Sequence, residues 1–202
     1  MMKAPFATIA ILLIGGSVRA LSASTPTYDG KWWLSVDKWQ REGFVDGYLA
    51  CYIFDAKGEI KFEYSGQMYA PRVTDYLATH PNEQEKPAEE LLWAITKPPY
   101  APPARKHLGG QGETDPGKYG LYDGEFWRET EDSKHLGFIQ GFLYCYSKYG
   151  DASKGTFSKP ASWYVEAISK WYEIDGEGGI NLKKMSAKIP TILFKFRDEA
   201  AH

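Results

Sequence analysis

The chain contains an internal repeat, and this feature constrains its fold more than any other. The 25 residues that begin at Tyr28 recur from Tyr122 with an offset of 94 residues and no gap, and ten aligned positions are identical. The matches include an opening Tyr-Asp-Gly, a Trp and the segment Gly-Phe-x-x-Gly-x-Leu-x-Cys-Tyr. Two copies of one unit predict a structure in which equivalent elements pack around an approximate two-fold axis.

The N-terminus has the pattern of a secretory signal peptide. Lys3 supplies a charged start, an apolar run extends to Ile14, and small residues ending at Ala20 or Ala23 offer cleavage sites. The run is shorter than the roughly 20 apolar residues that span a bilayer. We expect residues 1–23 to be removed, which leaves a periplasmic or secreted chain with no membrane span. The mature chain has 22 cations against 26 acids, a net charge of −4, and no basic stripe that would predict nucleic-acid binding.

The rest of the chain divides into three parts. Residues 24–96 form the first repeat, residues 97–120 a linker in which ten of 24 residues are Pro or Gly, and residues 121–202 the second repeat. Apolar residues recur at spacings of three and four within each repeat, which is helical periodicity. The predicted fold is therefore mainly α: two tandem three-helix repeats packed as one pseudo-two-fold domain.

Local signals predict where the helices begin. Each repeat is expected to open with an Asp-Gly turn, in which Asp29 or Asp123 accepts backbone hydrogen bonds. Ser35 and Thr130 are the expected N-caps of the two main helices. The other expected helices are Pro71–Thr79, Pro87–Thr96, Pro160–Tyr172 with Ser158 as cap, and Asn181–Arg197 with a break or restart at Pro190. The alternating stretch Ile60–Tyr64 is interpreted as loop, because it has no clear partner strand.

Small residues spaced four apart follow one face of each main helix. They are Gly43, Gly47 and Cys51 in the first repeat and Gly137, Gly141 and Cys145 in the second. Each Gly inside a helix costs about 1 kcal/mol relative to Ala, so these glycines predict unusually close packing of two helices. Facing grooves would let Cys51 bond to Cys145, as expected for two cysteines outside the cytosol. If the crossing instead centres on Gly47 and Gly141, the two sulfur atoms lie on opposite sides and cannot join.

Aromatic residues make up 15% of the chain, including seven Trp. Equivalent aromatic positions in the two repeats form either the core or a cleft between the halves that would stack on sugar rings or hold a protein partner. These candidate binding residues are Trp33, Tyr48, Tyr52, Trp127, Phe142 and Tyr146. Asp46 and Gln140 occupy one equivalent polar position within the helix motif.

The sequence predicts no catalytic residue, no metal site and no cofactor. Asp29 and Asp123 resemble a glycosidase pair only in being duplicated acids, and turn capping explains them more simply. The acidic loop from Glu173 has an EF-hand-like start but places Lys184 where calcium requires a bidentate Glu. The histidines lack metal-ligand spacing. His80, His107 and His135 are all expected to be exposed to solvent.

The stretch Gly-Phe-Val-Asp-Gly-Tyr at residues 43–48 and its copy resemble the helix motif of small periplasmic immunity proteins. Those proteins are helical and disulfide-bearing, and they block peptidoglycan-degrading toxins delivered by type VI secretion. The wider pattern, which runs from Trp-Trp-Leu-Ser to the final Ile-Leu-Phe-Lys-Phe-Arg-Asp, also resembles a family of secreted bacterial proteins with a duplicated Gly-Phe-x-x-Gly-x-Leu-x-Cys-Tyr motif. Neither resemblance assigns a role to an individual residue.

Two classes of function follow. The first is an exported non-enzymatic binding protein with a protein or glycan partner in the cell envelope, such as an inhibitor or immunity protein that acts on a cell-wall enzyme. The alternative is a glycan- or cell-wall-acting hydrolase with an unrecognised carboxylate site. The second class requires two carboxyl groups about 5–10 Å apart in a cleft lined by aromatic residues.

Overall fold

The computed structural model describes residues 27–55, 65–100, 122–172 and 185–198, and these residues are mainly α-helical. The helices of the first repeat are α1 (Gly30–Ser35), α2 (Lys38–Asp55), α3 (Gly66–Thr79), the 3-10 helix η1 (Pro81–Glu83) and α4 (Ala88–Ala94). Those of the second are α6 (Gly124–Glu129), α7 (Asp132–Tyr149), the 3-10 helix η2 (Ala152–Lys154), α8 (Ala161–Tyr172) and α10 (Ile189–Lys195). Within the described ranges, β pairing is limited to two isolated bridges, Asp29–Pro87 and Thr156–Asp198.

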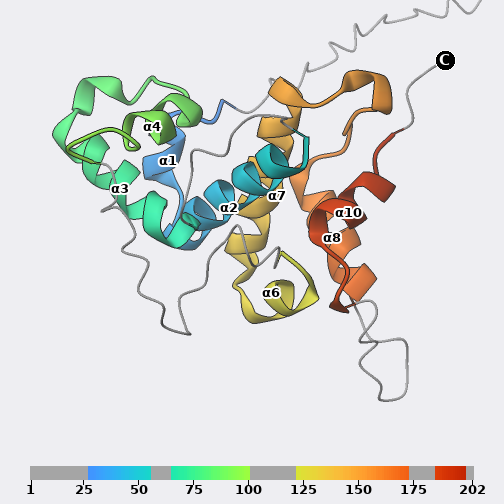
Figure 1. Ribbon diagram of the computed structural model, residues 1–202. Coiled ribbons are helices and arrows are strands. Elements are labelled where there is room, and N and C mark those ends of the chain that lie inside the picture. Colours follow the sequence, from blue (N-terminus) through green and yellow to red (C-terminus); the bar gives the residue numbers. More distant parts are fainter. Residues whose placement is uncertain (1–26, 56–64, 101–121, 173–184, 199–202) are drawn as a thin grey trace, which may run out of the picture.

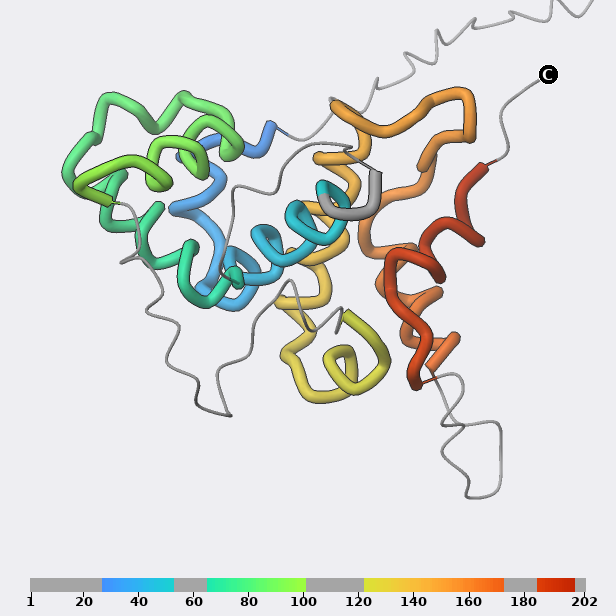
Figure 2. Tube along the Cα trace, viewed as in Figure 1, coloured from blue at the N-terminus to red at the C-terminus, as the bar shows by residue number. Residues whose placement is uncertain are grey.

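The two 18-residue helices α2 and α7 cross at the centre of the molecule and, among the helices that the structure describes, make the most extensive contact. Figure 1 shows α1, α3 and α4 on one side of this pair, with α8 and α10 on the other. The chain trace in Figure 2 makes the same division by colour, with blue to green segments on one side and orange to red segments on the other. Each half therefore covers its own long helix.

Corresponding contacts attach the flanking helices of each half. The indole N–H of Trp33 donates to the hydroxyl of Thr74 on α3 at 3.1 Å. In the second half, the indole N–H of Trp127 donates to the hydroxyl of Ser169 on α8 at 3.0 Å. Trp33 and Trp127 are both buried, and hydrogen bonding of both indoles removes the cost of burying an unpaired donor.

The last helices of the two halves are also attached in corresponding ways. The Ala88 N–H of α4 donates to the Tyr28 carbonyl at 2.7 Å, and the Ile189 N–H of α10 donates to the Tyr122 carbonyl at 2.6 Å. Pro190 lies in the first turn of α10, where its missing N–H costs nothing. The expected restart at Pro190 is thus the beginning of this helix.

The Asp-Gly segments cap short helices, as the turn chemistry predicts. The Asp29 carboxylate accepts the Trp32 N–H at 2.8 Å, and the Asp123 carboxylate accepts the Glu125 and Phe126 N–H groups at 3.0 and 3.3 Å. The aromatic residues that follow each Asp-Gly are helical rather than in a turn, so α1 and α6 are additional helices. The capping role of both acids is confirmed.

The predicted N-caps of the two long helices are wrong. Ser35 is the last residue of α1, and the side chain of Asp37 instead accepts the Gln40 N–H at 2.9 Å. Thr130 follows α6, and its hydroxyl donates back to the Phe126 carbonyl at 2.8 Å. Both hydroxyl residues therefore end a short helix that the sequence patterns did not reveal.

Two further helix starts differ from the prediction. α3 begins at Gly66 and carries Pro71 in its interior, because the Asp46 carboxylate accepts the Gly66 N–H at 2.7 Å and fixes an earlier start. α8 begins at Ala161, but Ser158 does not cap it. The Ser158 backbone N–H instead donates to the Asp198 carboxylate at 3.1 Å.

Several sequence predictions fall outside the described residues. These are the signal segment 1–23, the stretch 60–64, most of the linker, the acidic loop from residue 173, and His107. Among the helices that the structure does describe, none combines the length and apolar character needed to cross a bilayer.

Candidate functional site

The glycine faces of α2 and α7 touch the backbone of the opposite helix. A Cβ added at any of the four glycines would overlap a carbonyl oxygen across the crossing. The contacts are Gly43 on Lys134, Gly137 on Gln40, Gly47 on Phe138 and Gly141 on Phe44. Because each contact recurs with both partners shifted by 94 residues, the approach is reciprocal. Residues with a side chain at these positions would hold the helices apart.

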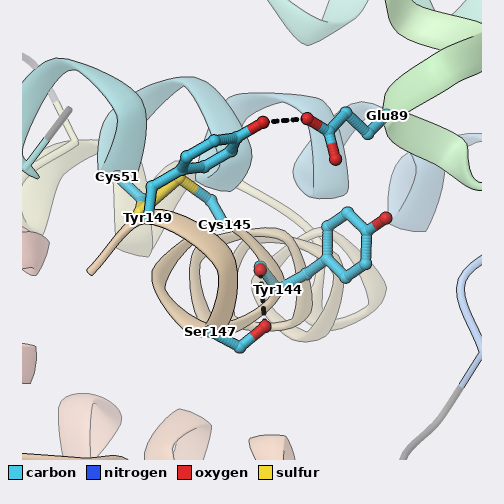
Figure 3. Close-up of a disulfide and its surroundings, with 6 residues drawn as sticks. All are labelled: Cys51, Glu89, Tyr144, Cys145, Ser147 and Tyr149. Carbon is cyan, nitrogen blue, oxygen red and sulfur yellow. Dashed lines mark hydrogen bonds between the residues drawn. A yellow bond between two sulfur atoms is a disulfide. The ribbon is translucent and has the colours of Figure 1, made fainter. Parts of the chain in front are cut away.

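One turn beyond the glycines, Cys51 and Cys145 form a disulfide between α2 and α7, with their Cα atoms 6.1 Å apart (Figure 3). Both cysteines are completely buried. The alternative crossing that separates the two sulfur atoms is therefore not the arrangement in this structure. A bridge that closes a loop of this length stabilises a fold by roughly 4–5 kcal/mol on the chain-entropy account.

The six candidate binding aromatics lie mainly in the core rather than on a binding face. Five of them are buried, and Tyr52 is half-buried. The buried five are Trp33, Tyr48, Trp127, Phe142 and Tyr146. They therefore offer no open stacking surface to a sugar ring, and their contacts join the two halves to the crossing helices.

A buried carboxylate lies beside the crossing. Asp46 is 2% exposed, and it accepts hydrogen bonds from the Gly66 N–H at 2.7 Å and the Tyr122 hydroxyl at 3.0 Å. The Lys134 ammonium lies 3.4 Å from Asp46 and 3.6 Å from Glu42. Burial raises the pKa of Asp46, while the Lys134 charge and both hydrogen bonds oppose that rise. Burial beside this acid also raises the pKa of Tyr122.

The equivalent polar position of the second repeat makes a neutral contact. Gln140 accepts a hydrogen bond from the Gln40 amide at 2.8 Å. Gln40 and Gln140 correspond, at the offset of 94, to Lys134 and Asp46. The two helices therefore meet through one charged contact and one amide contact.

A second charged cluster joins α4 of the first half to the end of α7. Glu89 accepts hydrogen bonds from the Lys148 ammonium and the Tyr149 hydroxyl, and Figure 3 shows the Tyr149 contact beside the disulfide. Although its burial acts in the other direction, these donors lower the pKa of Glu89. A carboxyl held in its ionised form is poorly suited to act as a general acid. Glu89 is thus best explained as an electrostatic link between the halves.

The histidine predictions are wrong for both histidines within the described part. His135 is 6% exposed, stacks on the Trp127 ring at 4.0 Å, and hydrogen-bonds the Trp127 carbonyl through Nε2 at 2.6 Å. Because a carbonyl can only accept, Nε2 carries the proton. Burial lowers the pKa of His135. His80 is half-buried and stacks on Tyr76 at 4.2 Å.

A pocket of about 240 Å³ opens between α2 and α3. Its lining combines two cations, two carboxylates and a small apolar floor: Lys38, Arg41, Glu42, Ala70, Pro71, Thr74 and Asp75. The Arg41 guanidinium is fixed by the Val36 carbonyl at 2.7 and 3.1 Å and by the Thr74 hydroxyl at 3.1 Å. The pocket wall is thus held in place by hydrogen bonds from the protein itself.

An aromatic face covers α8 and α10 on the second half. We define it by Trp163, Trp171 and Phe196, whose rings form a continuous row. The Phe196 ring centre lies 5.9 Å from that of Trp163 and 6.5 Å from that of Trp171. Trp163 is 40% exposed, and the Lys195 ammonium lies 4.2 Å above the Trp171 ring. Trp and Phe side chains are enriched where proteins bind one another, and Trp is prominent among the residues that contribute most to binding.

Across the part of the chain that the structure describes, no three His, Cys, Asp or Glu side chains gather closely enough to hold a metal ion. No family model, curated protein or solved structure matches the chain.

The sequence patterns do not single out the aromatic face or the pocket. The buried residues Tyr164 and Ile168 mark the inward stripe of α8, and Trp171, seven residues after Tyr164, lies on the edge of that stripe. Only Trp163 falls clearly outside the stripe, so helical periodicity gives no signal for an outward aromatic row. The pocket had no local signal, because α2 and α3 contribute its charges from positions more than 30 residues apart in the sequence.

Proposed function

We propose that this chain is an exported, non-catalytic binding protein that attaches to a protein of the cell envelope through the aromatic face. On this proposal it acts as an inhibitor or immunity protein toward a cell-wall-degrading enzyme. The observation that carries the proposal is the exposed Trp163 ring in a row with Phe196 and Trp171, beside the Lys195 charge. Trp residues supply a large share of the binding energy in many protein interfaces.

The buried carboxylates support a non-catalytic role. Asp46 is bound by Lys134, Tyr122 and the Gly66 N–H, and Glu89 is bound by Lys148 and Tyr149. Both acids are engaged in contacts that tie one element of the fold to another. A disulfide and a charged link between halves suit a rigid binding surface, because rigidity reduces the entropy lost on association.

The test is a peptidoglycan-clearing assay with the mature, oxidised chain. We expect the chain alone to leave the turbidity of a peptidoglycan suspension unchanged. Against a panel of purified muramidases, transglycosylases and amidases, it should slow at least one enzyme at equimolar amounts. Trp163→Ser should abolish that inhibition, whereas Trp39→Ser, on the other half and 37% exposed, should retain it. Failure to slow any of these enzymes, or equal loss from both variants, would contradict the proposal.

One observation favours the alternative of a wall-acting hydrolase: Glu42 and Asp75 line the same pocket. Glycosidases use two carboxyl groups on either side of the scissile bond. Glu42, however, is buried and already lies 3.6 Å from the Lys134 ammonium. Release of soluble muropeptides by the chain alone, lost in Asp75→Asn, would establish this function in place of inhibition.

A further inference from the structure

We infer that the pocket between α2 and α3 binds a small zwitterion, namely a free α-amino acid with a small side chain. This site is separate from the aromatic face and does not depend on the proposed function. Its lining offers cations and carboxylates together within about 240 Å³. Pockets for drug-sized ligands are larger, roughly 300–1,000 Å³, so the volume selects a small ligand.

The cationic side of the pocket is preorganised for a carboxylate. Three of the five N–H groups of Arg41 are used by Val36 and Thr74, which leaves two for a ligand. The Thr74 hydroxyl is itself fixed, because it also accepts the Trp33 indole N–H and donates to the Ala70 carbonyl. An arginine held in place loses little entropy on binding, and its planar fork matches a carboxylate.

The two carboxylates of the pocket suit an ammonium group. Asp75 is exposed on α3 at the pocket lining, and Glu42 is buried behind it with Lys134 as its partner. A ligand with only a negative charge would meet both carboxylates, and a ligand with only a positive charge would meet Arg41 and Lys38. A zwitterion satisfies both sets, while a methyl-sized side chain can rest on Ala70 and Pro71.

The second half does not reproduce these charges. At the offset of 94, His135 corresponds to Arg41, Leu136 to Glu42 and Asp132 to Lys38. His135 is turned inward against Trp127, so it presents no cation at the surface. The charges that α2 contributes to the pocket are therefore not repeated on α7. Such a difference is expected of a site added to a structural unit.

The test titrates the full mature chain with alanine, in both stereochemical forms, and follows the Trp33 indole N–H by NMR. Alanine amide lacks the carboxylate and N-acetylalanine lacks the ammonium, so each should bind at least about tenfold more weakly than alanine. Asp75→Asn should weaken alanine about tenfold but should not weaken N-acetylalanine, which has no ammonium for Asp75 to bind and is repelled by its charge. Glu85→Gln, an exposed acid paired with Lys31 outside the pocket, is the matched control and should bind as the parent chain does.

Three outcomes would overturn the inference. Equal binding of alanine, its amide and its N-acetyl form would show that charge is not recognised. The absence of any shift at Trp33 with all three compounds would show that the pocket is not a site for this class of ligand. Equal weakening of alanine by Asp75→Asn and Glu85→Gln would show a general electrostatic effect. Clearing assays on the same samples report the proposed function separately.

Discussion

The crossing of α2 and α7 contains two contacts in equivalent places that differ in chemistry. On one side Lys134 lies 3.4 Å from Asp46, and on the other Gln40 donates to Gln140 at 2.8 Å. The backbone approach is the same on both sides, because each pair sits beside a glycine that touches the opposite helix. Close packing is therefore compatible with either an ion pair or an amide pair at this position.

The difference shows where the charged pair is useful. The Asp46 carboxylate also accepts the Gly66 N–H and the Tyr122 hydroxyl, so it joins α3 and the start of the second repeat to the crossing. Gln140 accepts its hydrogen bond from Gln40 and remains half-buried. A buried ion pair is costly to desolvate, but here the Asp46 carboxylate binds donors from three different segments of the fold. The charged side thus organises the fold, whereas the amide side adds one local contact.

The largest expected effect comes from removing one partner on each side. Lys134→Met leaves Asp46 buried without its cation and should lower the free energy of unfolding by about 3–5 kcal/mol at neutral pH. Gln40→Met, the matched change, should cost about 1 kcal/mol, because one hydrogen bond is lost at a half-buried site. Denaturant titration of both variants measures the two losses in the free energy of unfolding and so checks their ratio.

Acid should bring the unfolding free energies of the two variants closer together. Without Lys134, the pKa of Asp46 rises above that of the parent chain, so the folded state takes up a proton before the unfolded state does. The loss in Lys134→Met should therefore shrink as pH falls toward the ordinary carboxyl range near 4. Equal costs for the two variants at neutral pH would remove the distinction between the charged and the amide side.

The glycine contacts should behave symmetrically where the polar contacts do not. Gly43→Ala and Gly137→Ala each place a Cβ on a backbone carbonyl that cannot swing away, so each should cost about 3 kcal/mol. Gln67→Ala, an exposed change on α3, is the control and should stay within about 0.5 kcal/mol of the parent chain. A much smaller cost on one side would mean that the two helices approach each other unequally.

The sequence predicted those features whose signal lies within a short stretch of the chain. Glycines four apart are readable because only a residue without Cβ allows such an approach, and the Asp29 and Asp123 caps are readable because their partners lie within three residues. The start of α3 was not readable, since it depends on Asp46, 20 residues away. The burial of His135 also escaped prediction, because its partner Trp127 lies on a separate short helix.

A double substitution tests whether charge itself is needed. Asp46→Asn together with Lys134→Gln converts the charged side into an amide pair like that of Gln40 and Gln140, while Asn retains an acceptor for the Gly66 N–H. We expect the double variant to lose less than Lys134→Met, because Asp46 no longer leaves an unpaired charge, although the buried Glu42 loses its Lys134 partner in both variants. Chemical unfolding of the single and double variants gives the coupling energy. A double variant as unstable as Lys134→Met would show that the ion pair stabilises the fold beyond its hydrogen bonds.

The smallest expected effect on stability concerns His135, whose equivalent in the first repeat is Arg41. Arg41 is permanently charged at the surface pocket, whereas His135 is buried and its pKa lies below the ordinary value of 6.5. Because the unfolded chain takes up the proton first, the contribution of His135 is present above pH 6.5 and is lost as pH falls through the folded pKa. Asp132 and Glu131 partly favour the protonated ring, which limits this loss. His135→Gln keeps a donor for the Trp127 carbonyl but does not titrate. Its unfolding free energy should therefore fall less than that of the parent chain between about pH 8 and 5, and parallel pH profiles would show that His135 is not a source of acid sensitivity.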